Sequence, residues 1–524
     1  MTAIHALYIT IILIILLGIF IYKKPSLNFK IFIIIGILYI LEYNFQIEEK
    51  FMNRRLWGLT EFLFWCYVIF GVITIIIRAR FDKNLDMSAH GTASWADNNF
   101  LQRFLSKTGL FIGYNNDYVR INSKGHLLTV APTRSGKGVS AIIPNLLTYE
   151  GSIICIDPKG ENATITAKRR REINENVFII DPWDIVKGEE KANINPIEFL
   201  SDNKDLAEDV AYIADALVYD PPGQVGEAHW NEEAKALISG FLMYIVKTYP
   251  NNKNLSKLRD LLTLDEESLK GLFKDMQESD YNLIKRCANR MLNKSDKEFS
   301  GVLSTAHRHT QFLDSNRIEE STNSSSFDIT DLIKNPSSVF IVIPPDKIGA
   351  FNRWLRIILT NLIMGLTKAG ERPNQDIMFF IDEFAAIGRF KIIETAMGLM
   401  AGYGMKFWLF LQDLSQLKSL YEQSYATFIS NSSVFQIFGT NDYETAKYIS
   451  DSIGQTTIMT TTINESGKLT EFNKNSYSTT SRNLLTPDEI MNLPDHVQIV
   501  FIEGKPILLA KLNYYADRFF SKFL

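Results

Sequence analysis

The chain has 524 residues, more than one compact core usually supports, so two or more domains are expected. Hydrophobic residues make up 46% and charged residues 22%, which excludes a disordered or collagen-like chain. The net charge of −4 gives the molecule as a whole no electrostatic attraction to nucleic acid, and its 3 cysteines are too far apart in sequence for a disulfide framework or a zinc ribbon.

The first 85 residues are strongly apolar and predict a transmembrane helical anchor. Uncharged apolar runs over 6–22 and 62–77 each approach the roughly 17 to 25 residues that a spanning helix needs. A shorter run over 31–41 makes the number of helices two or three. A cleaved signal peptide is the alternative for the first run, but that run lacks a basic opening and a small-residue cleavage site. Basic residues after the first and last runs predict a multi-pass protein whose remaining chain is cytoplasmic.

Residues 127–130 are predicted to form a buried strand that leads into a phosphate-binding loop and then a helix. Backbone N–H groups of such a loop bind the phosphates of ATP, and Lys137 adds a positive charge for the outer phosphates. The alternative, for the loop taken alone, is an ordinary glycine-rich turn with a surface lysine. The residues expected to contact nucleotide are Thr133, Arg134, Ser135, Gly136, Lys137, Gly138 and Val139.

The loop departs from the usual G-x-x-x-x-G-K-[ST] pattern at two positions. Ala131 replaces the first glycine, and Gly138 replaces the hydroxyl residue that normally contacts Mg²⁺. Magnesium would then be held by water, by Asp382, or by the hydroxyl of Ser135 or Ser140.

The interval between Lys137 and Asp382 is far longer than a minimal nucleotide-binding core needs, so an inserted domain is predicted. Residues 205–320 have helical periodicity and no convincing strand, which predicts an all-α domain with helices over 233–246, 256–262 and 280–292. The nucleotide-binding domain would consist of 86–204 and 321–524.

The insertion carries a group of basic residues: Lys285, Arg286, Arg290 and Lys294. One interpretation is contact with DNA phosphates. The other is a solvated helix face, which is the more common role of charge runs and is favoured here.

Two further strands are predicted to end in polar residues. Residues 377–381 lead into Asp382-Glu383, in which the first carboxylate would order Mg²⁺ and the second would polarise the attacking water. Residues 407–411 lead into Gln412, which can hydrogen-bond the terminal phosphate or the water. Taken singly, these residues have the alternative interpretations of a helix N-cap and a polar strand end.

The order of the elements predicts an α/β P-loop core. Strand-length apolar runs over 152–156, 177–180, 339–343 and 434–438 are mostly separated by helical patterns, which is typical of a mainly parallel sheet with ligands at its carboxyl edge. Residues 456–481, rich in Thr, Ser and Asn, predict a mobile loop. Residues 497–502 and 507–510 predict a hairpin at the edge of the sheet.

Several ordered motifs resemble those of the coupling ATPases of type IV secretion and conjugation systems. Besides the phosphate loop, Asp382-Glu383-Phe384 and Gln412, they are His90-Gly91-Thr92-Ala93-Ser94-Trp95-Ala96, Asp157-Pro158-Lys159-Gly160-Glu161, Asn195-Pro196 and Arg482-Asn483-Leu484-Leu485-Thr486-Pro487-Asp488-Glu489.

This resemblance implies a RecA-like motor that binds ATP and Mg²⁺ and forms a homo-hexamer. It also implies recruitment of relaxase-bound single-stranded DNA, effector proteins or both, and their delivery to a type IV secretion channel at the bacterial inner membrane. The family tolerates a glycine at the position of Gly138.

Hexameric members complete the site with an arginine from the neighbouring subunit. The stretch 400–406, where some relatives carry it, has no arginine, so Arg389 is the candidate, with a surface charge as its alternative role. Two other functions stay open: a septal-type DNA translocase, and a membrane receptor that binds nucleotide and docks cargo with little hydrolysis.

Overall fold

The computed structural model describes residues 65, 69, 88–174, 176–219, 228–463 and 475–524. By its internal contacts the chain divides into two units, of which the second comprises Thr92–Thr456 and Arg482–Leu524. This second unit contains the large sheet and the helices that position the candidate site.

An eleven-stranded sheet forms the centre of the second unit, in the order β2-β1-β13-β12-β9-β3-β8-β7-β4-β6-β5. The strands from β9 to β5 are mutually parallel, whereas β12, β13, β1 and β2 are each antiparallel to their neighbours. The strands are β1 (Leu105–Tyr114), β2 (Tyr118–Ile121), β3 (His126–Val130), β4 (Ile153–Asp157), β5 (Asn176–Ile180), β6 (Ser337–Val342), β7 (Ile377–Ile381), β8 (Met405–Leu411), β9 (Ser432–Ile437), β12 (Val497–Ile502) and β13 (Lys505–Ala510).

Most of the parallel strands, such as β3, β4, β6 and β7, are buried on both faces, as expected for a sheet covered by helices on each side. In β7, Phe379 and Ile381 belong to one hydrophobic core, while Met378 and Phe380 belong to the other. The helices between the strands are α5 (Ile143–Leu146), α6 (Glu161–Asn174), α15 (Pro345–Lys368), α16 (Lys391–Leu399), α17 (Leu414–Tyr421), α18 (Tyr425–Ser430), α19 (Tyr443–Ile453) and α20 (Pro487–Met491). The predicted α/β core is confirmed.

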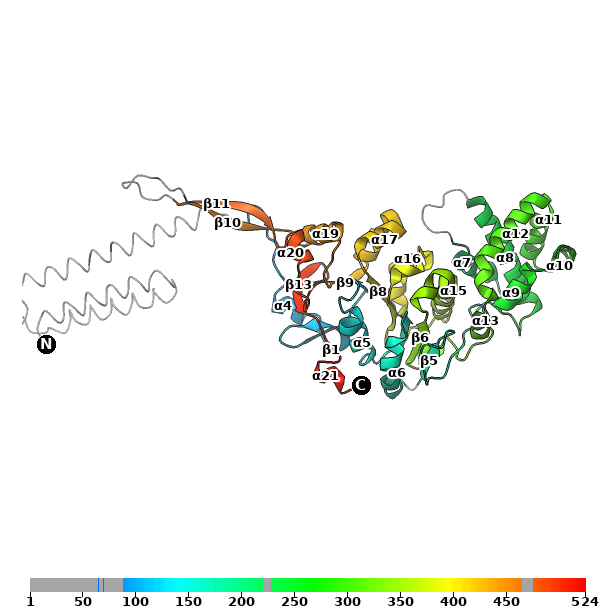
Figure 1. Ribbon diagram of the computed structural model, residues 1–524, viewed down its shortest axis with the longest axis horizontal. Coiled ribbons are helices and arrows are strands. Elements are labelled where there is room, and N and C mark those ends of the chain that lie inside the picture. The colour runs from blue at the N-terminus through cyan, green and yellow to red at the C-terminus, as the bar shows by residue number, and fades with distance from the viewer. Residues whose placement is uncertain (1–64, 66–68, 70–87, 175, 220–227, 464–474) are drawn as a thin grey trace, which may run out of the picture. The chain divides into compact units, whose positions relative to one another are not determined.

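Within the described residues from Leu206 to Thr322, the regular elements are all helices, drawn in green at one end of the second unit (Figure 1). They are α7 (Leu206–Leu217), α8 (Ala228–Thr248), α9 (Leu255–Leu262), α10 (Glu266–Glu278), α11 (Asn282–Leu292), α12 (Asp296–Thr310), η2 (Gln311–Asp314) and α13 (Asn316–Thr322). The predicted helices over 233–246, 256–262 and 280–292 are confirmed. The limits of an inserted domain at 205 and 320 stay a prediction.

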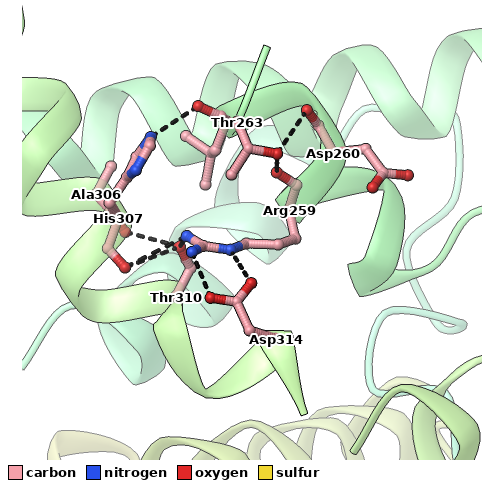
Figure 2. A network of polar contacts seen from close by, with 8 residues as sticks. Arg259, Asp260, Thr263, Ala306, His307, Thr310 and Asp314 are labelled. Carbon is pink, nitrogen blue, oxygen red and sulfur yellow. Dashed lines mark hydrogen bonds and ion pairs between the residues drawn. The ribbon is translucent and has the colours of Figure 1, made fainter. Parts of the chain in front are cut away.

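A polar network fastens these helices to one another. The guanidinium of Arg259, on α9, donates from Nε and Nη2 to the two carboxylate oxygens of Asp314 at 2.6 and 2.7 Å (Figure 2). Its Nη1 reaches the hydroxyl of Thr310, on α12, at 3.0 Å. His307 Nε2 lies 2.8 Å from the carbonyl oxygen of Leu262. The positive charge of Arg259 is therefore paired within the helical region.

Two sequence predictions about strands are wrong. The hairpin of β12 and β13 does not lie at the sheet edge, because β13 pairs with β1 at Tyr114 and Ala510, and β2 follows beyond β1. Residues 456–481 are not simply a loop, since β10 (Gln455–Ile463) and β11 (Asn475–Asn483) form a two-stranded sheet. Threonine is β-branched and therefore suits a strand as well as a loop.

The prediction of a multi-pass protein of the inner membrane is wrong for the residues that the structure describes: none of their helices is both long enough and apolar enough to cross a bilayer. The helix α15 has 24 residues but carries charged side chains such as Asp346, Arg353 and Arg356. The predicted spans over 6–22, 31–41 and 62–77 lie outside the described residues, apart from Trp65 and Ile69.

Candidate nucleotide site

The sheet brings three predicted site segments together. Strands β3, β8 and β7 are adjacent and parallel, with Val130 beside Leu411 and Ile381 beside Leu409. Their carboxyl ends therefore meet at one edge. The phosphate loop, Gln412 and the Asp382-Glu383 pair follow directly after these ends.

Lys137 is bound to both carboxylates. Its Nζ lies 2.9 Å from Asp382 Oδ1 and 2.5 Å from Glu383 Oε1. Burial lowers the pKa of Lys137, but the two carboxylates outweigh burial and the pKa is raised overall. The pKa of Asp382 is raised overall, chiefly by burial and also by the charge of Glu383, although Lys137 opposes this rise. These three charges form a compact group that can rearrange when a more highly charged anion enters.

Glu383 is held in an unusual conformation. Its φ of 56° and ψ of 47° are left-handed, which is uncommon for a residue other than glycine and costs of the order of 1 kcal/mol. Its Oε2 accepts a hydrogen bond from Gln412 Nε2 at 3.2 Å, while Oε1 meets Lys137. The carboxylate is thus oriented from two neighbouring strands. Strain of this kind is typical of functional sites.

The phosphate loop is exposed where a ligand would enter it. Thr133 and Arg134 are exposed, and Arg134 has a φ of 65°. Gly136 has a φ of 91°, a value that a side chain would make strained. The hydroxyl of Ser135 is buried and has no hydrogen-bond partner among the described residues. A buried hydroxyl without a partner in such a loop can donate a hydrogen bond to a ligand or accept one from it, or bind a metal ion through its oxygen.

The helix after the loop begins with a π-helical turn, η1 (Gly138–Ile142). Here the N–H of Ile143 bonds the carbonyl of Gly138, five residues earlier, instead of the usual four. Pro144 explains the change, because proline has no N–H to donate to the preceding turn. Such turns are common at functional sites.

Magnesium and a nucleotide fit the residues at this edge. Mg²⁺ prefers oxygen ligands and commonly takes one or two carboxylates together with waters and substrate phosphates. Asp382 provides a carboxylate, and the unpaired hydroxyl of Ser135 lies in the loop. A side chain at Gly138 would meet no atom within 4 Å, so the missing hydroxyl at that position does not result from crowding.

Asp157 is a third carboxylate at this edge of the sheet. It begins the motif at residues 157–161, for which the sequence predicts no role. Ile156 pairs with Ile381, so Asp157 and Asp382 leave neighbouring strands at the same height. Burial raises the pKa of Asp157 to about 6, although N–H groups at the start of α6 oppose this rise. One of them, Ala163 N–H, donates to Asp157 Oδ2 at 2.8 Å.

Arg389 does not reach Lys137 within its own chain. Its side chain is exposed and forms no hydrogen bond or ion pair with a described residue. Its backbone is held firmly: the carbonyl oxygen accepts from Arg356 Nη1 at 2.6 Å, and the N–H donates to Tyr219 Oη at 3.1 Å.

Arg356 is a structural residue that the sequence did not reveal. It is only 3% exposed, and it donates to the carbonyl oxygens of Ala216, at the end of α7, and of Arg389. Its guanidinium lies 4.4 Å from the ring centres of both Tyr219 and Phe390. Arg356 thereby joins the end of α7 to the segment that follows Asp382-Glu383. The sequence signal for this structural role is an arginine within the apolar pattern of α15.

The basic residues of the helical region are largely paired. Arg290 and Lys294 lie 2.6 and 3.0 Å from the carboxylate of Glu233, and Lys294 also lies 2.6 Å from Glu298. By contrast, Arg286 forms no ion pair with any residue that the structure describes. The geometry favours a structural role for Arg290 and Lys294 over contact with DNA.

The sequence is similar to one family model and to known proteins. The family model described as type IV secretory system conjugative DNA transfer matches residues 80–524. Protein VirD4 of Rhizobium radiobacter is 28% identical over 487 residues, which cover 88% of this chain and 69% of that protein. Conjugal transfer protein TraG of Escherichia coli is 27% identical over 513 residues, covering 86% and 80%.

Solved structures agree on the fold. The bacterial conjugative coupling protein TrwBdeltaN70, in an unbound form, matches with a TM-score of 0.60 at 18% identity, covering 82% of this chain and 96% of that chain. The plasmid coupling protein TrwB in complex with ADP and Mg²⁺ matches with a TM-score of 0.59 at 17% identity, covering 81% and 96%.

Proposed function

This chain belongs to the type IV secretory system conjugative DNA transfer family, and from that membership we propose that its sheet edge binds and hydrolyses ATP to drive transfer. The resemblance drawn from the sequence motifs is confirmed, and the chain is a coupling protein of conjugative DNA transfer. The septal translocase is not favoured by these relatives.

One observation carries the proposal of hydrolysis: Lys137, Glu383 and Gln412 form a continuous contact chain across three strand ends. Binding of a triphosphate would draw the Lys137 ammonium to the outer phosphates and release Glu383 from its ion pair. The freed carboxylate, still held by Gln412, would accept a hydrogen bond from the attacking water. Positioning and charge stabilisation of this kind account for most of the catalysis of phosphoryl transfer.

Asp382 and the Ser135 hydroxyl would hold Mg²⁺ or its bound waters. When bound, Mg²⁺ supplies charge neutralisation for the phosphate oxygens. The TrwB complexes with ADP and Mg²⁺ and with a non-hydrolysable ATP analogue support binding of this cofactor pair by the shared fold.

The exposed side chain of Arg389 supports a role in a neighbouring subunit. In the homo-hexamer that we propose, Arg389 would approach the phosphates bound by the next copy and stabilise the charge that develops on them. The cargo would be single-stranded DNA carrying its relaxase, effector proteins, or both, passed to the type IV secretion channel.

The proposal is tested by measuring ATP hydrolysis by the purified full chain, with and without single-stranded DNA. We expect hydrolysis that depends on Mg²⁺ and rises when DNA is added. ATP binding without hydrolysis, at protein concentrations that support oligomers and with DNA present, would instead indicate a receptor that docks cargo.

A further inference from the structure

The segment after the last strand of the sheet packs against the phosphate loop. Lys511 Nζ donates to the carbonyl oxygens of Phe438 at 2.8 Å and Ser135 at 3.4 Å. The N–H of Tyr514 donates to the carbonyl oxygen of Val139 at 3.4 Å. Residues 511–515 therefore run along the loop and the first turn of its helix.

The π-helical turn explains why Val139 can accept this bond. In that register the carbonyl of Val139 would bond the N–H five residues later, which belongs to Pro144 and does not exist. The Tyr514 N–H donates a hydrogen bond to this carbonyl oxygen instead. A proline in the helix thus creates the attachment point for the segment.

The segment is fixed on both sides of Tyr515. Before it, Asn513 Oδ1 accepts from the N–H groups of Tyr515 at 3.2 Å and Ala516 at 3.1 Å, which forms a tight local turn. After it, Asp517 Oδ1 accepts from Tyr118 Oη at 2.5 Å and caps α21 (Arg518–Ser521).

The helix α21 adds an apolar anchor. Phe520 is fully buried in a small core with Phe111, Ile143 and Leu147. Ile143 and Leu147 lie on and directly after α5, which continues from the phosphate loop. The segment after β13 is therefore anchored on α5, the helix that follows the phosphate loop.

The side chain of Tyr515 is exposed to solvent. It is 60% exposed, and its ring meets that of Tyr514 edge to face, with centroids 5.4 Å apart. An exposed aromatic side chain on a fixed backbone offers a free face at little cost in conformational entropy.

The position of a bound nucleotide follows from the loop. Phosphate loops cradle the α- and β-phosphates with backbone N–H groups while the lysine reaches the β- and γ-phosphates. The nucleoside must then leave the loop on the side away from the lysine, past Gly138 and Val139. Tyr514 is hydrogen-bonded to Val139 there, and the Cα of Tyr515 lies about 3.8 Å from that of Tyr514.

We propose that residues 513–515 form the nucleoside wall of the site and that Tyr515 stacks on the purine base. This inference rests on the proposed binding of nucleotide and adds the residue that recognises the base. Stacking tolerates any base, so the wall favours nucleotides over inorganic phosphates without selecting strongly between adenine and guanine.

The test measures binding of two probes, ADP and inorganic triphosphate, to the full chain by calorimetry. Tyr515→Ala is expected to weaken ADP binding about tenfold and to leave triphosphate binding unchanged, since only the base loses its partner. Tyr515→Phe keeps the ring and is expected to bind ADP within about twofold of the wild type.

Tyr403→Ala is the matched control, because Tyr403 is 50% exposed and precedes β8 at the opposite edge of the sheet. It is expected to bind both probes as the wild type does. The inference is overturned if Tyr515→Ala binds ADP normally, or if it loses ADP and triphosphate equally. A wild-type chain that binds neither probe would overturn the proposed function as well.

Discussion

The carboxyl edge of the parallel strands and the helical segment from Leu206 to Thr322 both contain a group of ion-paired side chains, but the two groups have different surroundings. At the sheet edge Lys137 faces two carboxylates, the Ser135 hydroxyl has no partner among the described residues, and Glu383 is in a left-handed conformation. In the helical segment Glu233 and Glu298 together neutralise Arg290 and Lys294. Charges are paired in both regions, so the unpaired hydroxyl and the strained backbone are what distinguish the sheet edge as a candidate site.

The strongest test of this contrast is Lys137→Ala. We expect it to abolish ATP hydrolysis, a loss of at least about 10²-fold, because the outer phosphates lose their cation. Lys406→Ala is the control, since Lys406 is also paired, with Asp376 at 2.5 Å, but at the start of β8. Hydrolysis by the control variant is expected to stay near the wild-type rate. Equal losses in both variants would contradict a specific role of Lys137 in ATP hydrolysis at the sheet edge.

Glu383→Gln separates chemistry from binding. The amide keeps the hydrogen bond with Gln412 but cannot accept a proton, so the turnover rate should fall by about 10² to 10⁴ while ATP still binds. Steady-state kinetics and a binding titration check the two parts. Glu503→Gln, which alters an exposed pair with Lys124, serves as the control. Unchanged turnover in the Glu383 variant would exclude Glu383 from catalysis.

Glu233→Gln tests the paired region. Glu233 is 7% exposed, and the side chain of Lys294 beside it is 9% exposed, so removing the carboxylate should lower the free energy of unfolding by about 1 to 3 kcal/mol. Chemical unfolding measures the change. Arg286→Gln should alter stability by less than about 0.5 kcal/mol, since Arg286 has no ion pair among the described residues. A DNA affinity that loses its salt dependence on Arg290→Gln would contradict the structural role of that arginine.

The smallest expected effect concerns pH. The pKa of Asp157 is raised to about 6 in the folded state from 3.8, so the folded protein holds a proton that the unfolded chain releases over that interval. Asp157 therefore stabilises the fold at low pH and loses this contribution as the pH rises toward 6. Asp157→Asn should become more stable relative to the wild type as the pH increases from about 4 to about 6.

Asp442→Asn is a control of opposite sign. A hydrogen bond from Thr445 lowers the pKa of Asp442, so its contribution to stability is present at neutral pH and is lost as the pH falls. In unfolding free energies measured relative to the wild type, Asp157→Asn should gain stability as the pH rises from about 4 to about 6, whereas Asp442→Asn should gain it as the pH falls below about 4. Parallel curves would contradict the pKa shift of Asp157.

The sequence predicted the parts of the fold that rest on continuous apolar runs. Strands such as β3 and β7 are buried on both faces, so their composition alone separates them from surface elements. The strand β1 was not predicted, because its first four residues, Leu105–Thr108, are mostly polar and mostly exposed. Its place beside β13 depends on pairing across nearly 400 residues of chain, which no local pattern encodes.

The candidate site was predictable in residue type but not in arrangement. Motif spacing pointed to Lys137, Asp382, Glu383 and Gln412, and the sheet brings all four together. The left-handed backbone of Glu383 and the packing of Tyr514 on Val139 could not be foreseen, since both result from tertiary contacts. The role of Arg356 was hidden for the same reason, because its partners lie on α7 and after β7.

The strand order also governs when the protein can fold during synthesis. The strand β3, which carries the phosphate loop, lies between β8 and β9, and β1 needs β13 beside it. A ribosome must therefore translate about 270 further residues after the phosphate loop before the first neighbour of β3, the strand β8, is complete. Until then the apolar β3 stays without its sheet partners, and chaperones that shield nascent chains have a long interval in which to act.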